Sequence, residues 1–365
     1  MVEKSDKIIF VQGEFREELL NGKALCIYVI ASTKTSTIPG ISLAGQAPLL
    51  TLFTPALDVE YLYNGIPISF PIIPTTPEGI PTPAIITRSA IKLSQLPYII
   101  VDAGSFIEPR VSLLKLAWRT IGGRIDIENA LPLGTSRKLF EESKEVGKTY
   151  GSIANVIVIG ESMPGGTTTA MAILRALNYG EPDVVSSSSR DNPLELKRAI
   201  TDKALQRLKN NEDIFKINDI VGDPLHISIA GIALGALEKK SLVVLAGGTQ
   251  MLAVLSLMKE IEPQFDQRKV VLATTRWIYL DKGVKILNVL RKYFPEITFT
   301  YVDINFEDAP FKGLRAYEEG FVKEGVGAGG TAFLAMIRGV KVSELKSRVY
   351  EEYSNIISHG VIPYG

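Results

Sequence analysis

The stretch NVIVIGESMPGGTTTAMAILRAL, residues 155–177, carries the pattern that decides the fold. An apolar run of strand length, residues 155–159, enters a glycine-rich turn, and residues 167–177 follow it with helical spacing of their apolar positions. A strand that passes through a tight turn into a helix is the repeating unit of a parallel α/β sheet. We therefore expect an α/β fold, and we looked for the same unit elsewhere in the chain.

The unit recurs on both sides of this stretch. Most of the strand candidates are apolar throughout, which is typical of parallel strands covered on both faces. The alternation predicts a doubly wound, mostly parallel sheet in a Rossmann-like large domain, with ligands bound at the carboxyl ends of the strands. The other predicted strands are 24–31, 98–101, 242–246, 270–273 and 298–302, and the other predicted helices are 194–209, 226–237, 250–259, 282–293, 331–337 and 342–357.

Composition excludes several classes of function. Lysine plus arginine and aspartate plus glutamate number 40 each, so no net charge attracts the chain to nucleic acid or to an anionic membrane. A lone cysteine, Cys26, and two histidines, His226 and His359, predict neither a disulfide nor a metal site. The amino-terminal residues lack a signal-peptide pattern, and the apolar runs are too short to span a bilayer. We expect a cytoplasmic protein that acts on small molecules.

The first glycine turn is the strongest candidate for a ligand site. Gly160 and Gly165, with Thr167, nearly fit the phosphate-binding pattern G-x-x-x-x-G-K-[ST], but Gly166 stands in place of the lysine. Nucleotide triphosphate hydrolysis is therefore not expected, whereas main-chain N–H groups up to Thr168 can hold one phosphate at the helix start. The competing interpretation is a tight turn that only needs a positive φ.

Two further turns follow the same pattern less clearly. Gly247 and Gly248 come directly after the strand 242–246. Residues 325–330 read G-x-G-x-x-G, yet no strand leads into them and no acid follows at the spacing of a dinucleotide site. Glu324 directly precedes this turn, and it is either a base with a raised pKa or a surface carboxylate at a helix start. Glu161 has the same two interpretations, and His226 fits a core or capping position.

Four stretches, taken in order, resemble the nicotinate-nucleotide–dimethylbenzimidazole phosphoribosyltransferases of cobamide synthesis, in their archaeal branch. Residues 160–168, GESMPGGTT, are similar to that family's G-E-M-G-[IV]-x-N-T-T turn. Residues 229–236 with 243–248, and residues 274–287, are similar to its T-G-x-x-L-G-A-A…P-V-L-L-D-G and S-x-x-x-A-E-K-G stretches. Residues 324–328, EGVGA, are similar to its G-E-G-[ST]-G-A signature. The likeness runs from about residue 98 to 337.

The resemblance implies roles for particular residues. Glu324 takes the place of the family's catalytic base, and no cofactor is implied. The donor is expected to contact Glu161 and the three glycine turns, that is Gly160, Gly165, Gly166, Thr167, Thr168, Gly247, Gly248, Gly325 and Gly327. The acceptor base is expected beside Ser36 and Gln46. The resemblance also implies a homodimer, a large domain of about residues 24–340 and a small helical subdomain from about 1–23 and 341–365.

Three positions depart from the family pattern. Gly166 replaces an asparagine, Gly247 an aspartate and Pro193 a lysine, and Arg190, Lys197 or Arg198 are candidates to replace the lost cation. The sequence thus predicts transfer of a 5-phosphoribosyl group from nicotinate mononucleotide to an aromatic nitrogen base, either dimethylbenzimidazole or a related benzimidazole or purine. Two alternatives stay open: a non-catalytic nucleotide-binding homologue and a dinucleotide-dependent oxidoreductase.

Overall fold

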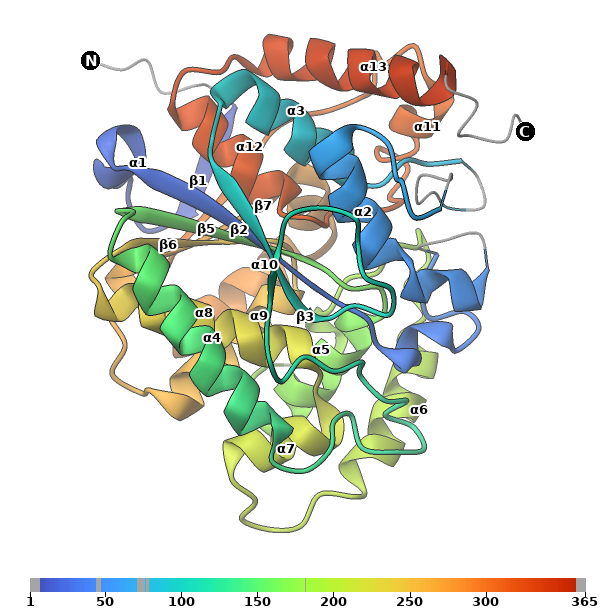
Figure 1. The fold of residues 1–365 in the computed structure, drawn as a ribbon, viewed down its shortest axis with the longest axis vertical. Coiled ribbons are helices and arrows are strands. Elements are labelled where there is room, and N and C mark those ends of the chain that lie inside the picture. The colour runs from blue at the N-terminus through green and yellow to red at the C-terminus, as the bar shows by residue number, and fades with distance from the viewer. Residues whose placement is uncertain (1–6, 44–46, 71–75, 77–78, 181, 359–365) are drawn as a thin grey trace.

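A computed structural model describes residues 7–43, 47–70, 76, 79–180 and 182–358 of the chain. Within them, one sheet runs through the molecule in the strand order β1-β8-β7-β6-β5-β2-β3-β4 (Figure 1). Every pair in it is parallel except β1 with β8. The strands are β1 (Ile8–Gln12), β2 (Ala24–Ala31), β3 (Tyr98–Gly104), β4 (Leu114–Lys115), β5 (Val156–Ser162), β6 (Leu242–Ala246), β7 (Val270–Thr275) and β8 (Thr298–Val302).

The predicted α/β sheet is confirmed, and each strand predicted from an apolar run is present. Two edge strands were not predicted: β4 is only two residues long, and β1 was not assigned as a strand although residues 8–11 form a short apolar run. Strand β1 pairs with β8 from the amino-terminal segment, inside the range that we expected to belong to a small helical subdomain. The proposed division into two domains stays a prediction.

Helices cover both faces of the sheet. On one face α8 packs against α4 and α9, while on the other α3 packs against α12 and α13, as the two layers in Figure 1 show. The helices are α1 (Glu18–Asn21), α2 (Thr54–Asn64), α3 (Ala84–Ser94), α4 (Thr135–Gly151), α5 (Gly166–Ala176), α6 (Leu194–Leu205), α7 (Ile214–Val221), α8 (Pro224–Glu238), α9 (Gln250–Ile261), α10 (Arg276–Tyr293), α11 (Lys312–Arg315), α12 (Ala328–Ile337) and α13 (Val342–Ser358).

Strand β2 shows why the strands read as apolar throughout. All of its side chains are buried, and successive ones enter opposite cores. Ile27 and Val29 belong to the core that contains α8, whereas Cys26 and Tyr28 belong to the core that contains α12. Because each face of the sheet is covered, neither set of side chains can be polar without a partner.

The strand order places a crevice at one point of the carboxyl edge. From β2 the chain moves outward through β3 to β4, then returns to β5 on the other side of β2 and continues outward to β8. Strands β2 and β5 are therefore neighbours whose following connections leave in opposite directions. Ligands of open α/β sheets bind outside such a switch point. Among the described residues, no helix is long and apolar enough to cross a membrane.

Candidate functional site

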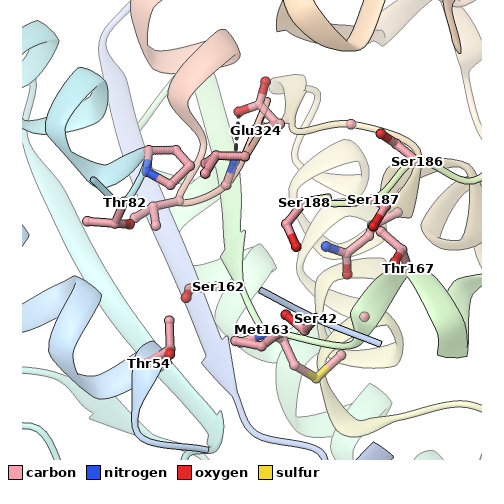
Figure 2. A pocket seen from close by; sticks show the side chains of 18 of the residues that line it. Ser42, Thr54, Thr82, Ser162, Met163, Thr167, Ser186, Ser187, Ser188 and Glu324 are labelled. Atoms are coloured by element: carbon pink, nitrogen blue, oxygen red, sulfur yellow. Dashed lines mark hydrogen bonds between the residues drawn. The ribbon is translucent and has the colours of Figure 1, made fainter. Parts of the chain in front are cut away.

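A pocket opens at this switch point, beyond the carboxyl ends of β5 and β6. Its wall combines the turn after β5, the residues that begin α9, the loop before α3 and the turn before α12. Figure 2 shows Ser186, Ser187, Ser188 and Thr167 along one side of the pocket, and Thr54, Thr82 and Ser162 along the other. Glu324 lies between these two sides at one end of the view. Residues from widely separated parts of the sequence thus meet in one cavity.

The first glycine turn forms the floor on the serine side. Gly165 has φ 80° and precedes α5, so it occupies the left-handed region that favours glycine. Gly165, Gly166 and Thr167 all line the pocket. The start of α5 therefore directs the positive end of the helix dipole toward the cavity, where an anion is stabilised, although the Gly166 and Thr168 N–H groups already donate to the carbonyls of Met163 and Gly165 at 3.1 and 2.9 Å.

Glu324 is a half-buried carboxylate fixed from four directions. Oε2 accepts from the Thr275 N–H at 3.0 Å and from the Thr274 hydroxyl at 3.2 Å. Oε1 accepts from the N–H groups of Gly329 and Gly325 at 3.0 and 3.2 Å. Burial raises the pKa of Glu324 to about 7, against the opposing effect of these hydrogen bonds. A carboxyl group that titrates near 7 is suited to accept a proton at neutral pH.

The backbone around Glu324 is strained. Val322, Lys323 and Val326 have φ values of 62°, 71° and 52°, a region that residues other than glycine rarely enter and β-branched ones such as valine least of all. Surrounding contacts hold this conformation: the Val326 N–H donates to the Glu161 carbonyl at 2.7 Å, and the Val326 carbonyl accepts from the Thr87 hydroxyl at 2.8 Å. Such strain concentrates at functional sites, because elsewhere nothing compensates for its cost.

Two more carboxyl groups lie in the same wall. Glu161 is 4% exposed, and its oxygens accept from the Met163 N–H at 3.1 Å and from Gln250 Nε2 at 2.9 Å. Burial, and then the nearby charges of Glu324 and Asp58, raise the pKa of Glu161 well above its usual value. Asp58 is also 4% exposed and accepts from the hydroxyls of Ser162 and Thr82 at 2.6 and 2.7 Å; burial raises its pKa to about 6.

The opposite side is backed by buried lysines. Lys197 is 0% exposed and donates to the Thr167 hydroxyl at 2.9 Å and to the Ser186 carbonyl at 2.6 Å. Lys323 donates to the carbonyls of Ser187 and Ser189 at 2.8 and 2.9 Å. Burial, followed by repulsion from Lys282 and Lys323, lowers the pKa of Lys197 to about 7. Asp281 accepts from the Ser186 hydroxyl at 2.7 Å and lies 3.6 Å from Lys323 Nζ, so the layer behind the serine loop contains several lysines and one carboxylate.

Of the cations considered for the lost lysine, the structure brings Lys197 to the first turn. Arg190 and Arg198 are exposed side chains. Lys197 reaches the turn because it lies on the buried face of α6, which packs against α5. The sequence spacing could not distinguish these three residues, because they differ in burial, and burial depends on how α6 packs in the folded protein.

The predicted donor residues divide into two groups. Glu161, Gly165, Gly166, Thr167, Gly248, Glu324 and Gly325 line the pocket. The others lie behind its wall: Gly160 and Gly327 pack against each other's main chain, Gly247 packs against Met251, and Thr168 is fully buried. For the three glycines of this second group, close packing explains the absence of a side chain.

Of the two predicted acceptor residues, the structure describes only Ser36, which does not line the cavity. Ser36 is buried behind Gly165, and its hydroxyl donates to the Thr33 carbonyl and shares a hydrogen bond with Thr51, both at 2.7 Å. Gln46 lies outside the described residues. The acceptor role of both stays a prediction.

The G-x-G-x-x-G run also serves packing. A Cβ at Gly329 would lie 2.2 Å from the Thr274 carbonyl carbon, and one at Gly330 would lie 2.3 Å from the Ala246 Cβ. These glycines let α12 pack directly on β6 and β7. The strand that precedes the run, β8, ends at Val302, so the strand–turn–helix arrangement of a dinucleotide site is not formed. Within the described part of the chain, no cluster of three or more potential ligands could hold a metal ion.

Several site residues carried no sequence signal. Asp58 lies in a helical run without a recognisable motif, and Lys323 precedes Glu324 without any motif of its own. Gln250 directly follows the second glycine turn, and that position at a strand's carboxyl end was a usable signal. His226 is fully buried, as its apolar neighbours predicted, but its ring also contacts Gln250 at 3.0 Å.

An open α/β sheet with a ligand pocket at its switch point defines the general class, and comparisons with known proteins narrow it. Residues 92–274 match the family model described as phosphoribosyltransferase. The UPF0284 protein of Aeropyrum pernix is 46% identical over 338 residues, which cover 92% of this chain and 94% of that protein. The UPF0284 protein of Sulfolobus acidocaldarius is 41% identical, with 95% and 99% covered.

Solved structures show the same fold. CobT from Thermus thermophilus matches with a TM-score of 0.62 at 17% identity, covering 94% of this chain and 87% of that one. A nicotinate-nucleotide–dimethylbenzimidazole phosphoribosyltransferase structure from the same organism matches with a TM-score of 0.61 at 18% identity and the same coverage. The chain belongs to the phosphoribosyltransferase family, as its sequence motifs predicted, and is a pentosyltransferase.

Proposed function

We propose that this enzyme transfers the 5-phosphoribosyl group of nicotinate mononucleotide to an aromatic nitrogen base and releases an α-riboside phosphate. The observation that carries the proposal is the position of Glu324, a carboxyl group with a pKa of about 7 in a pocket whose opposite side is cationic. Both the donor and the acceptor chemistry need this combination. We also propose that the enzyme acts as a homodimer, as the family resemblance implies.

The serine side is suited to the donor phosphate. The start of α5 brings the Thr167 main-chain N–H and the positive end of the helix dipole to this space, which Ser186, Ser187 and Ser188 also border. Lys197 adds a positive charge directly behind Thr167. A phosphate dianion is stabilised by such oriented donors, and more strongly so where water is excluded.

The acidic side is suited to the reaction centre. Burial, and then the charges of Glu324 and Asp58, raise the pKa of Glu161 well above its usual value, while burial raises the pKa of Glu324 to about 7, so Glu324 can exchange a proton near neutral pH. Glu161 is then placed to bind a ribose hydroxyl. Glu324 is the group available for proton abstraction.

The bond changes balance without an added acid. Glu324 takes the N–H proton of the incoming azole while its other ring nitrogen attacks the anomeric carbon. The glycosidic bond breaks on the opposite face, and its electron pair neutralises the pyridinium nitrogen of nicotinate. Because the leaving group is already cationic, the rate depends chiefly on orientation of the reactants and on the base. Attack opposite to the leaving group inverts the configuration and yields the α-riboside.

A direct assay tests the proposal. The protein is incubated with nicotinate mononucleotide and, one at a time, dimethylbenzimidazole, benzimidazole and adenine, and the products are followed by mass spectrometry. We expect free nicotinate and a riboside phosphate in equal amounts. Donor binding measured by calorimetry without any product from any base would instead identify a non-catalytic nucleotide-binding homologue.

A further inference from the structure

Gly166 presents a problem that the backbone does not explain. It is the first residue of α5, and it does not have the positive φ that would require glycine. Many residues could begin a helix at this position. A Cβ added at Gly166, however, would lie 1.9 Å from Oε1 of Gln250. The residue is therefore small because the amide of Gln250 occupies the space that its side chain would fill.

The amide of Gln250 is fixed at both ends. Its Nε2 donates to Oε1 of Glu161 at 2.9 Å, and its Oε1 lies 3.0 Å from Nε2 of His226. An amide oxygen can only accept, so Nε2 of His226 must carry a proton in this arrangement. The histidine thus determines which end of the amide faces Glu161.

A buried acid holds the histidine in turn. Nδ1 of His226 lies 2.5 Å from Oδ2 of Asp223, and both side chains are 0% exposed. Oδ1 of Asp223 also accepts from the His226 main-chain N–H at 2.7 Å, which caps α8. Burial opposes ionisation of Asp223, but the contact with His226 lowers its pKa below the ordinary value. Asp223 therefore holds the ring in the orientation that donates toward Gln250.

The chain of contacts ends at a group in the pocket wall. Each Glu161 oxygen accepts one N–H, from Gln250 or from Met163, and Glu161 also lines the cavity. If Gln250 were displaced, Glu161 would lose one of these two donors and could rotate away. A displaced carboxyl group would no longer meet the ribose at the correct distance.

We propose that Gln250, oriented by His226 and Asp223, is a positioning residue that holds Glu161 for the phosphoribosyl donor, and that Gly166 makes room for its amide. The inference rests on the proposed function, because it assigns Glu161 to the donor. It predicts that positions 166 and 250 are energetically coupled. It also predicts that substitutions at these positions will raise the KM for the donor and leave the KM for the acceptor unchanged.

A double-mutant cycle tests the coupling with Gly166→Ala, Gln250→Ala and the double variant. We expect either single change to raise the donor KM and lower kcat/KM for the donor by about 10- to 100-fold, the usual effect of losing a hydrogen bond to an ionisable group. The double variant should be no worse than Gln250→Ala, because the added methyl group then meets empty space. The acceptor KM should stay within about twofold. Gln206→Ala, an exposed glutamine that ends α6, is the control and should behave as wild type.

A thermal midpoint and donor titration on each variant separate the possible outcomes. Multiplicative losses in the double variant, or single variants with wild-type donor KM, would overturn the inference. A lower thermal midpoint with unchanged KM values would show a purely structural role and overturn it as well. A wild-type protein that binds no nicotinate mononucleotide would instead contradict the proposed function. Rescue of Gln250→Ala by Gly166→Asn, which returns an amide to the vacated space, would support the inference further.

Discussion

The serine side and the acidic side of the pocket differ in charge. Lysines lie behind the serine side, whereas the acidic side contains Glu161 and Glu324. On the serine side, buried lysines donate to main-chain carbonyls, the Ser186 hydroxyl donates to Asp281, and the serines line the cavity. On the acidic side, Glu324 and Glu161 accept from main-chain N–H groups and leave carboxyl groups facing the cavity. A chain with zero formal net charge therefore contains a strongly polarised site.

This difference restricts the ligands that the pocket can stabilise. A ligand with an anionic end and a proton-donating or cationic end satisfies both sides, whereas a uniformly charged ligand is repelled by one of them. Nicotinate mononucleotide has a phosphate at one end and a pyridinium at the other. In the proposed reaction, the azole that replaces nicotinate has an N–H group that it can donate to the acidic side.

Breaking the acidic side should have the largest effect. Glu324→Gln keeps the shape of the side chain but removes the base, so kcat should fall by about 10²- to 10⁴-fold with little change in donor binding. Steady-state kinetics and a thermal midpoint on the same preparation check this. Normal turnover with a lowered midpoint would mean that Glu324 only stabilises the start of α12.

Removing a charge from the serine side should have a smaller effect, and it should act on donor binding more than on turnover. Lys197→Met keeps the buried stem but removes the charge behind Thr167, so the donor KM should rise by about 10- to 100-fold while kcat changes less. Arg198→Met, an exposed change on the same helix, is the matched control. An unchanged donor KM in Lys197→Met would show that the donor phosphate does not bind on the serine side.

The pH dependence should report both sides at once. Glu324, whose pKa is raised to about 7, is active when deprotonated, so kcat/KM for the donor should rise through that pH. Lys197, whose pKa is lowered to about 7, is active when protonated, so kcat/KM should fall above it. The profile should be a narrow bell near pH 7 with limbs of up to about tenfold per pH unit. Lys197→Met should lose the alkaline limb and keep the acidic one.

The smallest effect is expected at the first glycine turn, where a comparison of two glycines distinguishes backbone strain from close packing. Gly165 and Gly134 both precede helices with positive φ, 80° and 86°, but only Gly165 has close neighbours, the main chain of Ser36 at 2.9 Å. Gly134→Ala should cost about 1 kcal/mol of unfolding free energy, and Gly165→Ala should cost more. Denaturant titrations compare the two. Equal losses would show that contact with Ser36 does not restrict the turn.

Much of the fold was readable from local sequence. Runs such as residues 242–246 are buried on both faces and therefore continuously apolar, and the strand formed there has the predicted bounds. Strand β1 was missed although residues 8–11 are apolar, because its antiparallel pairing with β8 lies outside the strand–turn–helix unit on which the prediction rests. The glycine turns were found for the same local reason, although Gly160 and Gly327 proved to serve contact between two turns.

By itself, the sequence determined six of the eight strands of the described sheet, the three glycine turns and Glu324 beside the last of them. Tertiary structure alone decided that Lys197 backs the phosphate side, that Asp58 joins the acidic side and that Gln250 fills the space above Gly166. The physical reason is the range of the interactions. Turns and periodicity depend on neighbours along the chain, whereas the contact between Gln250 and Glu161 joins residues 89 positions apart and exists only once β5 and β6 are paired.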